Sequence, residues 1–164
     1  MKALLALSRA IDALNERIGH LVYWLILAMV LVSSTNAVLR YTLSIASNAW
    51  LEMQWYMFAA VFLLCAGYTL LHNEHIRIDI FGFILFMLPA TIIMTYLSWP
   101  IFHNSWMLGE VSSNAGGLVR WPVKIFLPIG FALLTLQGVS ELIKRIAMLT
   151  GDMPADLHYE RPLQ

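Results

Sequence analysis

An uncharged apolar run over residues 57–71 constrains the fold of this chain more than any other feature of its sequence. A polar stretch that contains Trp50, Glu52 and Trp55 precedes the run, and a charged stretch follows it. A segment of roughly 20 mostly apolar residues is long enough to cross the hydrocarbon core of a bilayer. The pattern therefore predicts a transmembrane helix over residues 50–71 with polar groups at both of its ends.

Three further apolar segments of similar length extend this interpretation to the whole chain. Hydrophobic residues make up 60% of the sequence and charged residues only 12%, whereas soluble domains carry about 25% charged residues. Small polar residues cluster at 33–36, and we interpret them as hydrogen-bonding groups between membrane helices. We predict an all-α integral membrane fold with four transmembrane helices, at about residues 18–39, 50–71, 81–103 and 123–146.

Residues 1–17 show a two-sided helical pattern that differs from the four spans. Apolar residues recur on one side, and charged residues, among them Arg9 and Asp12, occupy the other. A helix of this kind lies in the membrane interface with its apolar side facing the bilayer. We expect an amphipathic interfacial helix over residues 1–17 rather than an extension of the first span into solvent. The polar residues 147–164 are expected to form a cytoplasmic tail.

Basic residues are divided unevenly between the two ends of the expected helices. Four spans place both termini on one side of the membrane, and cytoplasmic segments carry an excess of Lys and Arg. We therefore expect both termini in the cytoplasm and the loops 40–49 and 104–121 on the outer side. Seven basic residues fall on the terminal side (Lys2, Arg9, Arg17, Arg77, Lys144, Arg145 and Arg161) and three on the other (Arg40, Arg120 and Lys124).

Two ion pairs are expected near the ends of the spans. Glu52 lies in the first turn of its helix, where an acidic side chain suits the helix dipole. Arg40 is its expected partner across the short loop between the first two spans. Glu141 and Arg145 are spaced i, i+4 and are expected to pair where the last span leaves the membrane.

The sequence contains no pattern that indicates catalysis. It has no Gly-rich phosphate loop, no HExxH and no nucleophile elbow. Its single cysteine, Cys65, cannot form a disulfide within the chain. A net charge of zero gives no electrostatic case for a nucleic-acid partner. We therefore expect no catalytic residue, no cofactor, no metal ion and no nucleic acid.

Two alternatives to a partner subunit stay open. His20 and His72 lie near the same ends of their spans, and a pair of histidines in a helix bundle can hold haem. That pair would fit a haem- or quinone-associated anchor subunit of a respiratory enzyme, which a haem Soret band would support. Glu52 is the one candidate for the membrane-embedded acid of a small self-sufficient multidrug exporter. Transport by the chain alone in liposomes would support that alternative.

Several short stretches together resemble the small permease subunit of tripartite ATP-independent periplasmic (TRAP) transporters. The resemblance covers roughly residues 39–144, and it departs from the family pattern in the short link that follows Asp79. The stretches that carry it are WLEMQW at 50–55, FLLCAGY at 62–68, HIRID at 75–79, GEVSS at 109–113, Gly116-Gly117 and Trp121-Pro122.

The resemblance implies a partner role in the inner membrane of a bacterium. The chain would bind a larger permease subunit, which carries substrate and sodium ions in an elevator motion, and would form part of its static scaffold. A periplasmic substrate-binding protein would dock on the outer face of the pair, and membrane lipids would surround the remaining surface. Substrates of the family are mostly carboxylates and related organic acids.

This interpretation assigns three groups of residues to function. One group is expected at the interface with the large subunit, one forms a cytoplasmic loop motif, and one is expected to receive the binding protein. The groups are Trp50, Glu52, Trp55 and Gly67 for the subunit interface, His75, Arg77 and Asp79 for the loop motif, and Glu110, Ser113 and Arg120 for docking.

Overall fold

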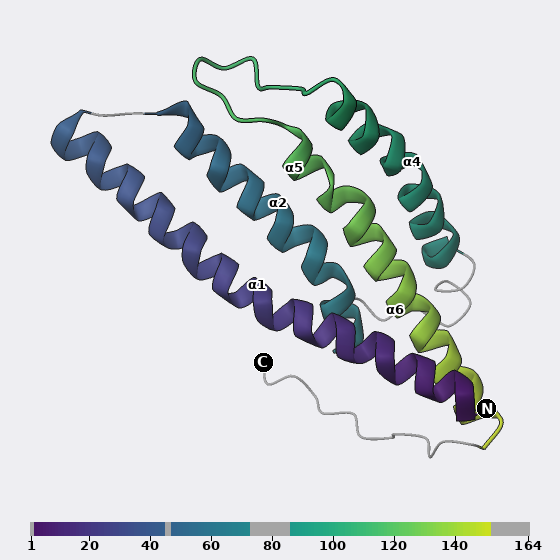
Figure 1. The fold of residues 1–164 in the computed structure, drawn as a ribbon. Helices are drawn as coiled ribbons and strands as arrows, with labels where there is room; N and C mark the ends of the chain where they lie inside the picture. Colours follow the sequence, from purple (N-terminus) through teal and green to yellow (C-terminus); the bar gives the residue numbers. More distant parts are fainter. Residues whose placement is uncertain (1, 45–46, 73–85, 152–164) are drawn as a thin grey trace.

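The computed structural model describes residues 2–44, 47–72 and 86–151, and these residues are almost entirely helical (Figure 1). The loop motif of His75, Arg77 and Asp79 lies outside the described residues. The described chain contains four long helices and one short helix. They are α1 (Lys2–Leu43), α2 (Asn48–Leu71), α4 (Leu88–Met107), α5 (Trp121–Lys124) and α6 (Phe126–Leu149).

Helix α1 is a single helix of 42 residues, so the structure shows no separate interfacial helix. At 1.5 Å per residue it is about 60 Å long, whereas the hydrocarbon core of a bilayer is about 30 Å thick. The stretch between Arg17 and Arg40 carries no charge and matches that thickness. The helix is therefore not interrupted at residue 18, where the sequence predicted a boundary. The uncharged stretch does begin at that position.

Part of the polar side of the first section of α1 faces another helix, although Arg9 on that side is exposed. Ser8 and Asn15 are fully buried against α6, whereas Leu4, Leu7 and Leu14 are 48%, 50% and 43% exposed. A hydrophobic stripe predicts an interfacial helix only when the polar residues of that helix meet solvent. Here the buried ones among them meet polar residues of α6.

Three helical segments within the described residues are long and apolar enough to cross a membrane: α1, α2 and the run Trp121–Leu149 that joins α5 to α6. Helix α4 is a fourth long helix, which begins at Leu88, with Pro89 in its first turn, and ends at Met107. It thus extends past the end of the expected span at 81–103, whose first five residues lie outside the described residues. Pro100 lies inside α4 without ending it.

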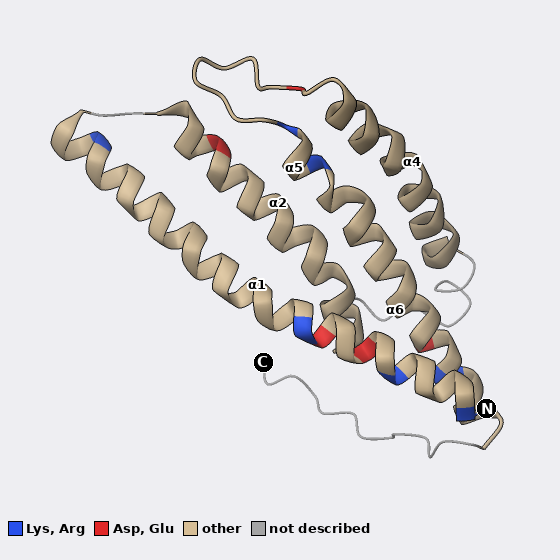
Figure 2. Cartoon of the chain, in the orientation of Figure 1, with Lys and Arg blue, Asp and Glu red and all other residues tan. Residues whose placement is uncertain are grey.

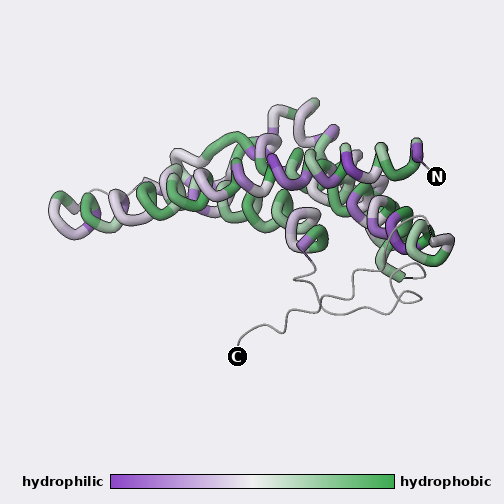
Figure 3. The backbone as a smooth tube through the Cα atoms, turned by 90° about the horizontal axis from the view of Figure 1, so that it is seen from below, coloured by the Kyte–Doolittle hydropathy of each residue, from purple (hydrophilic) through white to green (hydrophobic). Residues whose placement is uncertain are grey.

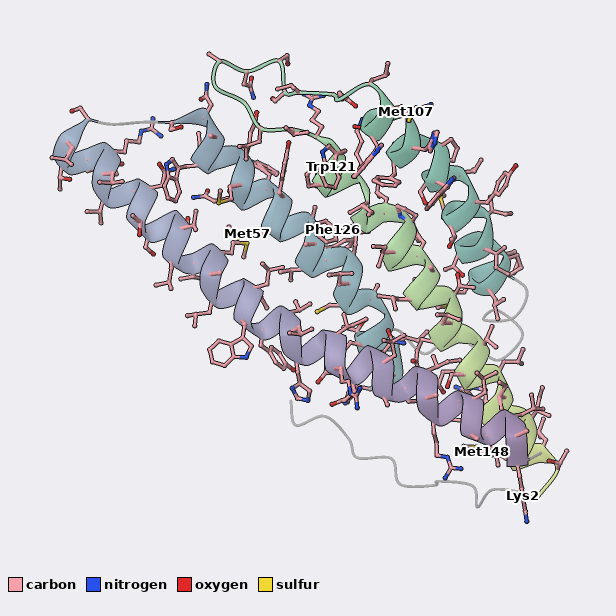
Figure 4. All side chains as sticks on the ribbon, viewed as in Figure 1. Lys2, Met57, Met107, Trp121, Phe126 and Met148 are labelled. Carbon is pink, nitrogen blue, oxygen red and sulfur yellow. The ribbon has the colours of Figure 1, made fainter. Side chains whose placement is uncertain are left out.

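The four long helices form an open row in the order α1, α2, α6, α4 (Figure 1), and Figure 3 shows the same backbone from below. Helix α2 packs between α1 and α6, and the first part of α1 also contacts α6. Helix α4 contacts α6 and the short α5 but neither α1 nor α2. The row therefore leaves long apolar helix faces uncovered, and Figure 4 shows side chains projecting away from the row along its length.

Small residues allow the helices of the row to approach closely. A Cβ atom built on Gly130 of α6 would lie 2.7 Å from the carbonyl oxygen of Leu63 in α2. A Cβ atom built on Gly19 of α1 would lie 2.2 Å from the Tyr68 ring. On α4, the buried residues Thr91, Ser98 and Ser105 recur at a spacing of seven. Small side chains at such positions are typical of helix packing in membranes, where close van der Waals contact replaces the hydrophobic effect.

Among the described residues, charged side chains lie at the two ends of the row and are absent from its middle (Figure 2). One end, here called the terminal end, contains the start of α1 and the end of α6, so that Lys2 and Met148 lie near each other (Figure 4). The other end, here called the loop end, contains the start of α2 and the loop between α4 and α5. The sites described below lie at these two ends and on the exposed face of α2.

Candidate functional site

The loop between α4 and α5 is folded back on itself in a short antiparallel arrangement. Val111 and Val119 form an isolated β-bridge. The Ser112 amide donates to the Leu118 carbonyl at 2.9 Å, and the Arg120 amide donates to the Glu110 carbonyl at 2.8 Å. The loop therefore has a defined backbone path at the loop end of the molecule.

Two glycines make the tip of this loop possible. Gly116 adopts φ +70°, a conformation that other residues rarely adopt. The Gly117 amide donates to the Asn114 carbonyl at 2.9 Å and closes the turn. The Asn48 side chain, at the start of α2, donates to the Ala115 carbonyl at 3.1 Å, so the tip lies against α2.

Glu52 of α2 is the main anchor of the loop. Its Oε1 accepts hydrogen bonds from the Ser112 hydroxyl and from Asn114 Nδ2, the latter at 2.8 Å. Its Oε2 accepts from the Leu118 amide at 2.7 Å. One carboxylate thus binds three groups on both sides of the turn, which fixes the loop to the first turns of α2.

The expected pairing of Glu52 with Arg40 is wrong. Arg40 is exposed near the end of α1, and no ion pair joins it to Glu52 in the described part of the chain. The physical reason is that hydrogen bonds from the folded loop already occupy both carboxylate oxygens. Arg40 is closer in sequence, but Ser112 and Leu118 are closer in space.

A second acidic group, Glu110, holds the other side of the loop. Its carboxylate pairs with Lys124 of α5, and its Oε1 lies 3.4 Å from Arg120 Nη1. The hydrogen bond from Lys124, reinforced by Arg120, lowers the pKa of Glu110 below its ordinary value of 4.5. Glu110 is therefore a stable anion that ties the loop to the beginning of the last membrane segment.

The structure brings the three expected docking residues into one loop but gives them different environments. Glu110 and Arg120 are half-buried and face each other. Ser113 is exposed close to the tip. Among the three, only Ser113 presents its side chain freely to a partner, whereas the two charged residues also stabilise the loop itself.

The expected interface residues on α2 are likewise divided. Trp55 is 71% exposed, and Phe58 and Phe62 on the same helix face are 55% and 70% exposed. The rings of Phe58 and Phe62 stack with centroids 6.5 Å apart. Their spacing of i, i+3 and i+7 predicts one continuous face. We call these three side chains the aromatic face of α2, and Trp50, which is 39% exposed, lies nearer the loop end.

A groove of about 490 Å³ runs beside the aromatic face, between α1 and α2. Met29, Val30 and Ser33 of α1 line one wall, and Gln54, Trp55 and Phe58 of α2 line the other. Ser33, from the polar cluster in the first span, therefore contributes to this surface as well as to helix packing.

Gly67 lies inside the chain instead of on its surface. It is buried, and a Cβ atom at this position would lie 2.3 Å from Asn15 Oδ1 of α1 and 3.3 Å from the Leu133 carbonyl oxygen of α6. It is therefore the point where three helices of the same chain meet. We do not assign Gly67 to the interface with the large subunit, because other helices of the same chain already cover it.

A buried polar cluster joins α1 to α6 at the terminal end, and the sequence interpretation missed it. Asn15 Nδ2 donates to Gln137 Oε1 at 2.9 Å, and Gln137 Nε2 donates to Asp12 Oδ1 at 2.9 Å. The Ser8 and Ser140 hydroxyls lie 2.7 Å apart. The spacing of Ser8, Asp12 and Asn15 on one face of α1 is the sequence pattern that could have indicated this cluster.

The expected pair of Glu141 with Arg145 is replaced by a different one in the described residues. Lys144 Nζ lies 2.5 Å from Glu141 Oε1 and 3.1 Å from Asp12 Oδ2. Lys144 thus bridges the acids of both helices, which a spacing rule confined to one helix could not indicate. Within the described residues, no group of three or more His, Cys, Asp or Glu side chains could hold a metal ion.

The comparison with protein families gives one match. Residues 29–148 match the family described as "Tripartite ATP-independent periplasmic transporters, DctQ component". No curated protein and no solved structure matches the chain. The match extends over most of the chain, from the middle of α1 to the end of α6, and includes the anchored loop and the aromatic face.

Proposed function

The chain belongs to the DctQ component family of TRAP transporters, a family of membrane subunits and not of enzymes, and from that premise we propose that it is the static scaffold of a sodium-coupled importer. In this role it holds a large permease subunit in the bilayer and helps a periplasmic substrate-binding protein to dock. Carboxylates and related organic acids are the proposed substrates. The large subunit, and not this chain, binds the substrate and the sodium ions.

The open row of helices is the observation that carries this proposal. A self-contained transporter needs polar or charged groups at the middle of the membrane, whereas the described charged residues gather at the two ends (Figure 2). A single row cannot enclose a substrate path, but it offers broad apolar faces to a partner. We propose that all four long helices, including α4, cross the membrane.

The aromatic face of α2 is the proposed contact with the large subunit. Its three exposed rings lie in the middle of the row, and large aromatic residues are the commonest strong contributors to protein interfaces. Trp50 and the groove that Met29, Val30 and Ser33 line extend the same surface toward α1. Glu52 contributes indirectly in this proposal, because it holds the loop above that surface.

The anchored loop is the proposed docking site for the binding protein, with Ser113 at its exposed tip. This assignment requires the loop end to face outward and both termini to lie in the cytoplasm. The described basic residues support that orientation, because Lys2, Arg9 and Arg17 lie at the start of α1 with Lys144 and Arg145 nearby on α6. A cysteine at Ser113 should then be labelled from the periplasm in intact cells.

Co-purification with the large subunit in mild detergent tests the proposed contact. The double variant W55A/F62A should lower recovery of the pair at least tenfold, since both side chains are more than two-thirds exposed in the isolated chain and contribute little to its own fold. Y96A is the matched control, because Tyr96 is an aromatic residue of α4 with 78% exposure. Unchanged recovery of W55A/F62A would exclude this face as the contact.

Reconstitution in liposomes tests the division of labour. The three components together should take up the organic acid only with an inward sodium gradient, and the chain alone should bind neither sodium nor substrate. For docking, E110K or R120E should slow uptake at limiting binding protein, because charges at the rim of an interface mainly alter the association rate. The swapped pair E110R/R120E keeps opposite charges together in the loop. It should still slow uptake if the loop receives the binding protein.

A further inference from the structure

The contact between α1 and α2 at the terminal end contains two histidines that share one carboxylate. His20 Nε2 lies 3.2 Å from Glu16 Oε1, and His72 Nε2 lies 3.5 Å from Glu16 Oε2. Glu16 and His20 belong to α1, and His72 is the residue that caps the end of α2. The carboxylate therefore connects one turn of α1 to the last turn of α2.

Both ring nitrogens of His72 face oxygen atoms that accept hydrogen bonds. Its Nδ1 lies 3.1 Å from the Tyr68 carbonyl oxygen, which can only accept a hydrogen bond. Its Nε2 faces the Glu16 carboxylate, which also only accepts when it is ionised. A neutral imidazole has one N–H group and satisfies one of these two contacts, whereas the imidazolium ion satisfies both.

Tyrosines of α1 and α2 complete the cluster. The Tyr23 and Tyr68 hydroxyls lie 3.1 Å apart across the helix pair, and the Tyr68 ring packs on His72 with centroids 4.3 Å apart. His20 contacts the edge of Tyr23 at 5.8 Å. The groups that face the two histidines from α1 and α2 are thus Glu16, Tyr23 and Tyr68.

Two charged groups of the neighbouring helix, Glu141 and Lys144, have other partners in the described structure. Helix α6 packs against both α1 and α2, and at this end it carries Glu141, Lys144 and Arg145. Glu141 and Lys144 pair with each other, and Lys144 also pairs with Asp12. Helix α4 contacts neither α1 nor α2. Glu16 is therefore the acid that the described structure places against His20 and His72.

We propose that Glu16, His20 and His72 form a proton-operated latch that ties the end of α2 to α1. The latch is closed when His72 carries its second proton and loosens when that proton leaves. Histidine side chains change charge between about pH 5 and 8, so acidification closes the latch and a rise in pH opens it. The latch would thus couple the acidity on the terminal side to how firmly the last turn of α2 is held against α1.

A double-mutant cycle on the full chain in detergent, with a metal chelator present, tests the latch. E16Q, H72Q and E16Q/H72Q are compared with the parent chain by unfolding at about pH 5.5 and about pH 8. The coupling between Glu16 and His72 should change the unfolding equilibrium about two- to fivefold at the lower pH and vanish at the higher pH. H103Q is the control, since His103 lies on α4, and it should leave this coupling intact.

A second measurement needs no destabilised variant. The His72 amide donates to the Tyr68 carbonyl at 3.2 Å, so its hydrogen-exchange protection factor reports whether the last turn of α2 is held. The factor should fall as the pH rises in the parent chain and stay constant in E16Q. Coupling or protection that does not change with pH would overturn the proposal. A pH dependence that appears only when zinc is added would assign the latch to a metal ion instead of a proton.

Discussion

The backbone amide of Leu118 donates a hydrogen bond to the Glu52 carboxylate over a distance of 2.7 Å, although the two residues are 66 positions apart in the chain. Glu52 lies in the second turn of α2, and Leu118 lies on the returning side of the loop that precedes α5. This bond and the two to Ser112 and Asn114 hold the loop over the start of α2. The loop is therefore part of the fold and not a free connection between helices.

Removal of the Glu52 carboxylate should release the loop without affecting membrane insertion. E52L leaves the Leu118 amide and the side chain of Asn114 without their acceptor. The loss of a hydrogen bond to a charged group costs more stability than the loss of one between neutral groups. A spin label at Ser113 should become several-fold more mobile in E52L. R40A is the control, because Arg40 has no contact with Glu52 in the described structure, and it should leave the label unchanged.

Replacement of Gln137 should destabilise the chain at its terminal end. Gln137 is fully buried and bonds both Asn15 and Asp12. Q137L removes one hydrogen bond from the buried Asn15 side chain and one from Asp12, at a cost of about 1–3 kcal/mol. Unfolding by a denaturing detergent should detect the loss. The double variant N15L/Q137L removes both polar groups of the pair and should recover part of it, whereas equal stability of Q137L and the parent chain would contradict the prediction.

The sequence was sufficient to predict the all-helical membrane fold and the positions of the charge-free stretches. Hydropathy and the lack of charge are local properties, and they correctly indicated the helices that contain residues 18–39 and 50–71. The residues at which these helices begin and end were harder to predict. Nothing in residues 1–17 reveals whether their polar side meets water or α6, because both environments favour the same two-sided pattern.

Partners of charged groups were predicted poorly for a related reason. Arg40 and Arg145 were chosen because they are close in sequence to Glu52 and Glu141. Glu52 is instead bound by a distant loop, and Glu141 pairs with Lys144 of its own helix, which also reaches Asp12 of α1. The glycines show the same limit. Gly67 could be recognised as a site of close approach, but the sequence did not indicate whether the approaching helix belonged to this chain or to another.

The close contact at Gly130 should not tolerate even one added methyl group. A Cβ atom there would lie 2.7 Å from the Leu63 carbonyl oxygen and 3.0 Å from its carbonyl carbon. These are backbone atoms, so α2 and α6 would have to separate. G130A should therefore destabilise the chain by about 1–3 kcal/mol, measured by unfolding in detergent. I129A is the control, since Ile129 is adjacent and 40% exposed, and it should cost clearly less.

The ion pair of Glu110 with Lys124 should make order in the loop depend on pH only under acidic conditions. The pKa of Glu110 in the folded chain lies below 4.5, its ordinary value, because Lys124 and Arg120 favour the charged carboxylate. A group with a lowered pKa stabilises the fold fully above its unfolded value, and that contribution is lost as the pH falls through the folded value. A spin label at Ser113 should thus report constant order near neutral pH and a loss of order below 4.5.

The variant E110Q separates this effect from other acids in the loop. It cannot form the ion pair at any pH, so the loop should be less ordered than in the parent chain at neutral pH. As the pH falls below 4.5, the difference between E110Q and the parent chain should shrink. Glu52 is present in both proteins, and its own titration therefore cancels in the comparison. A difference that persists at low pH would mean that Glu110 acts through its shape and packing rather than through its charge.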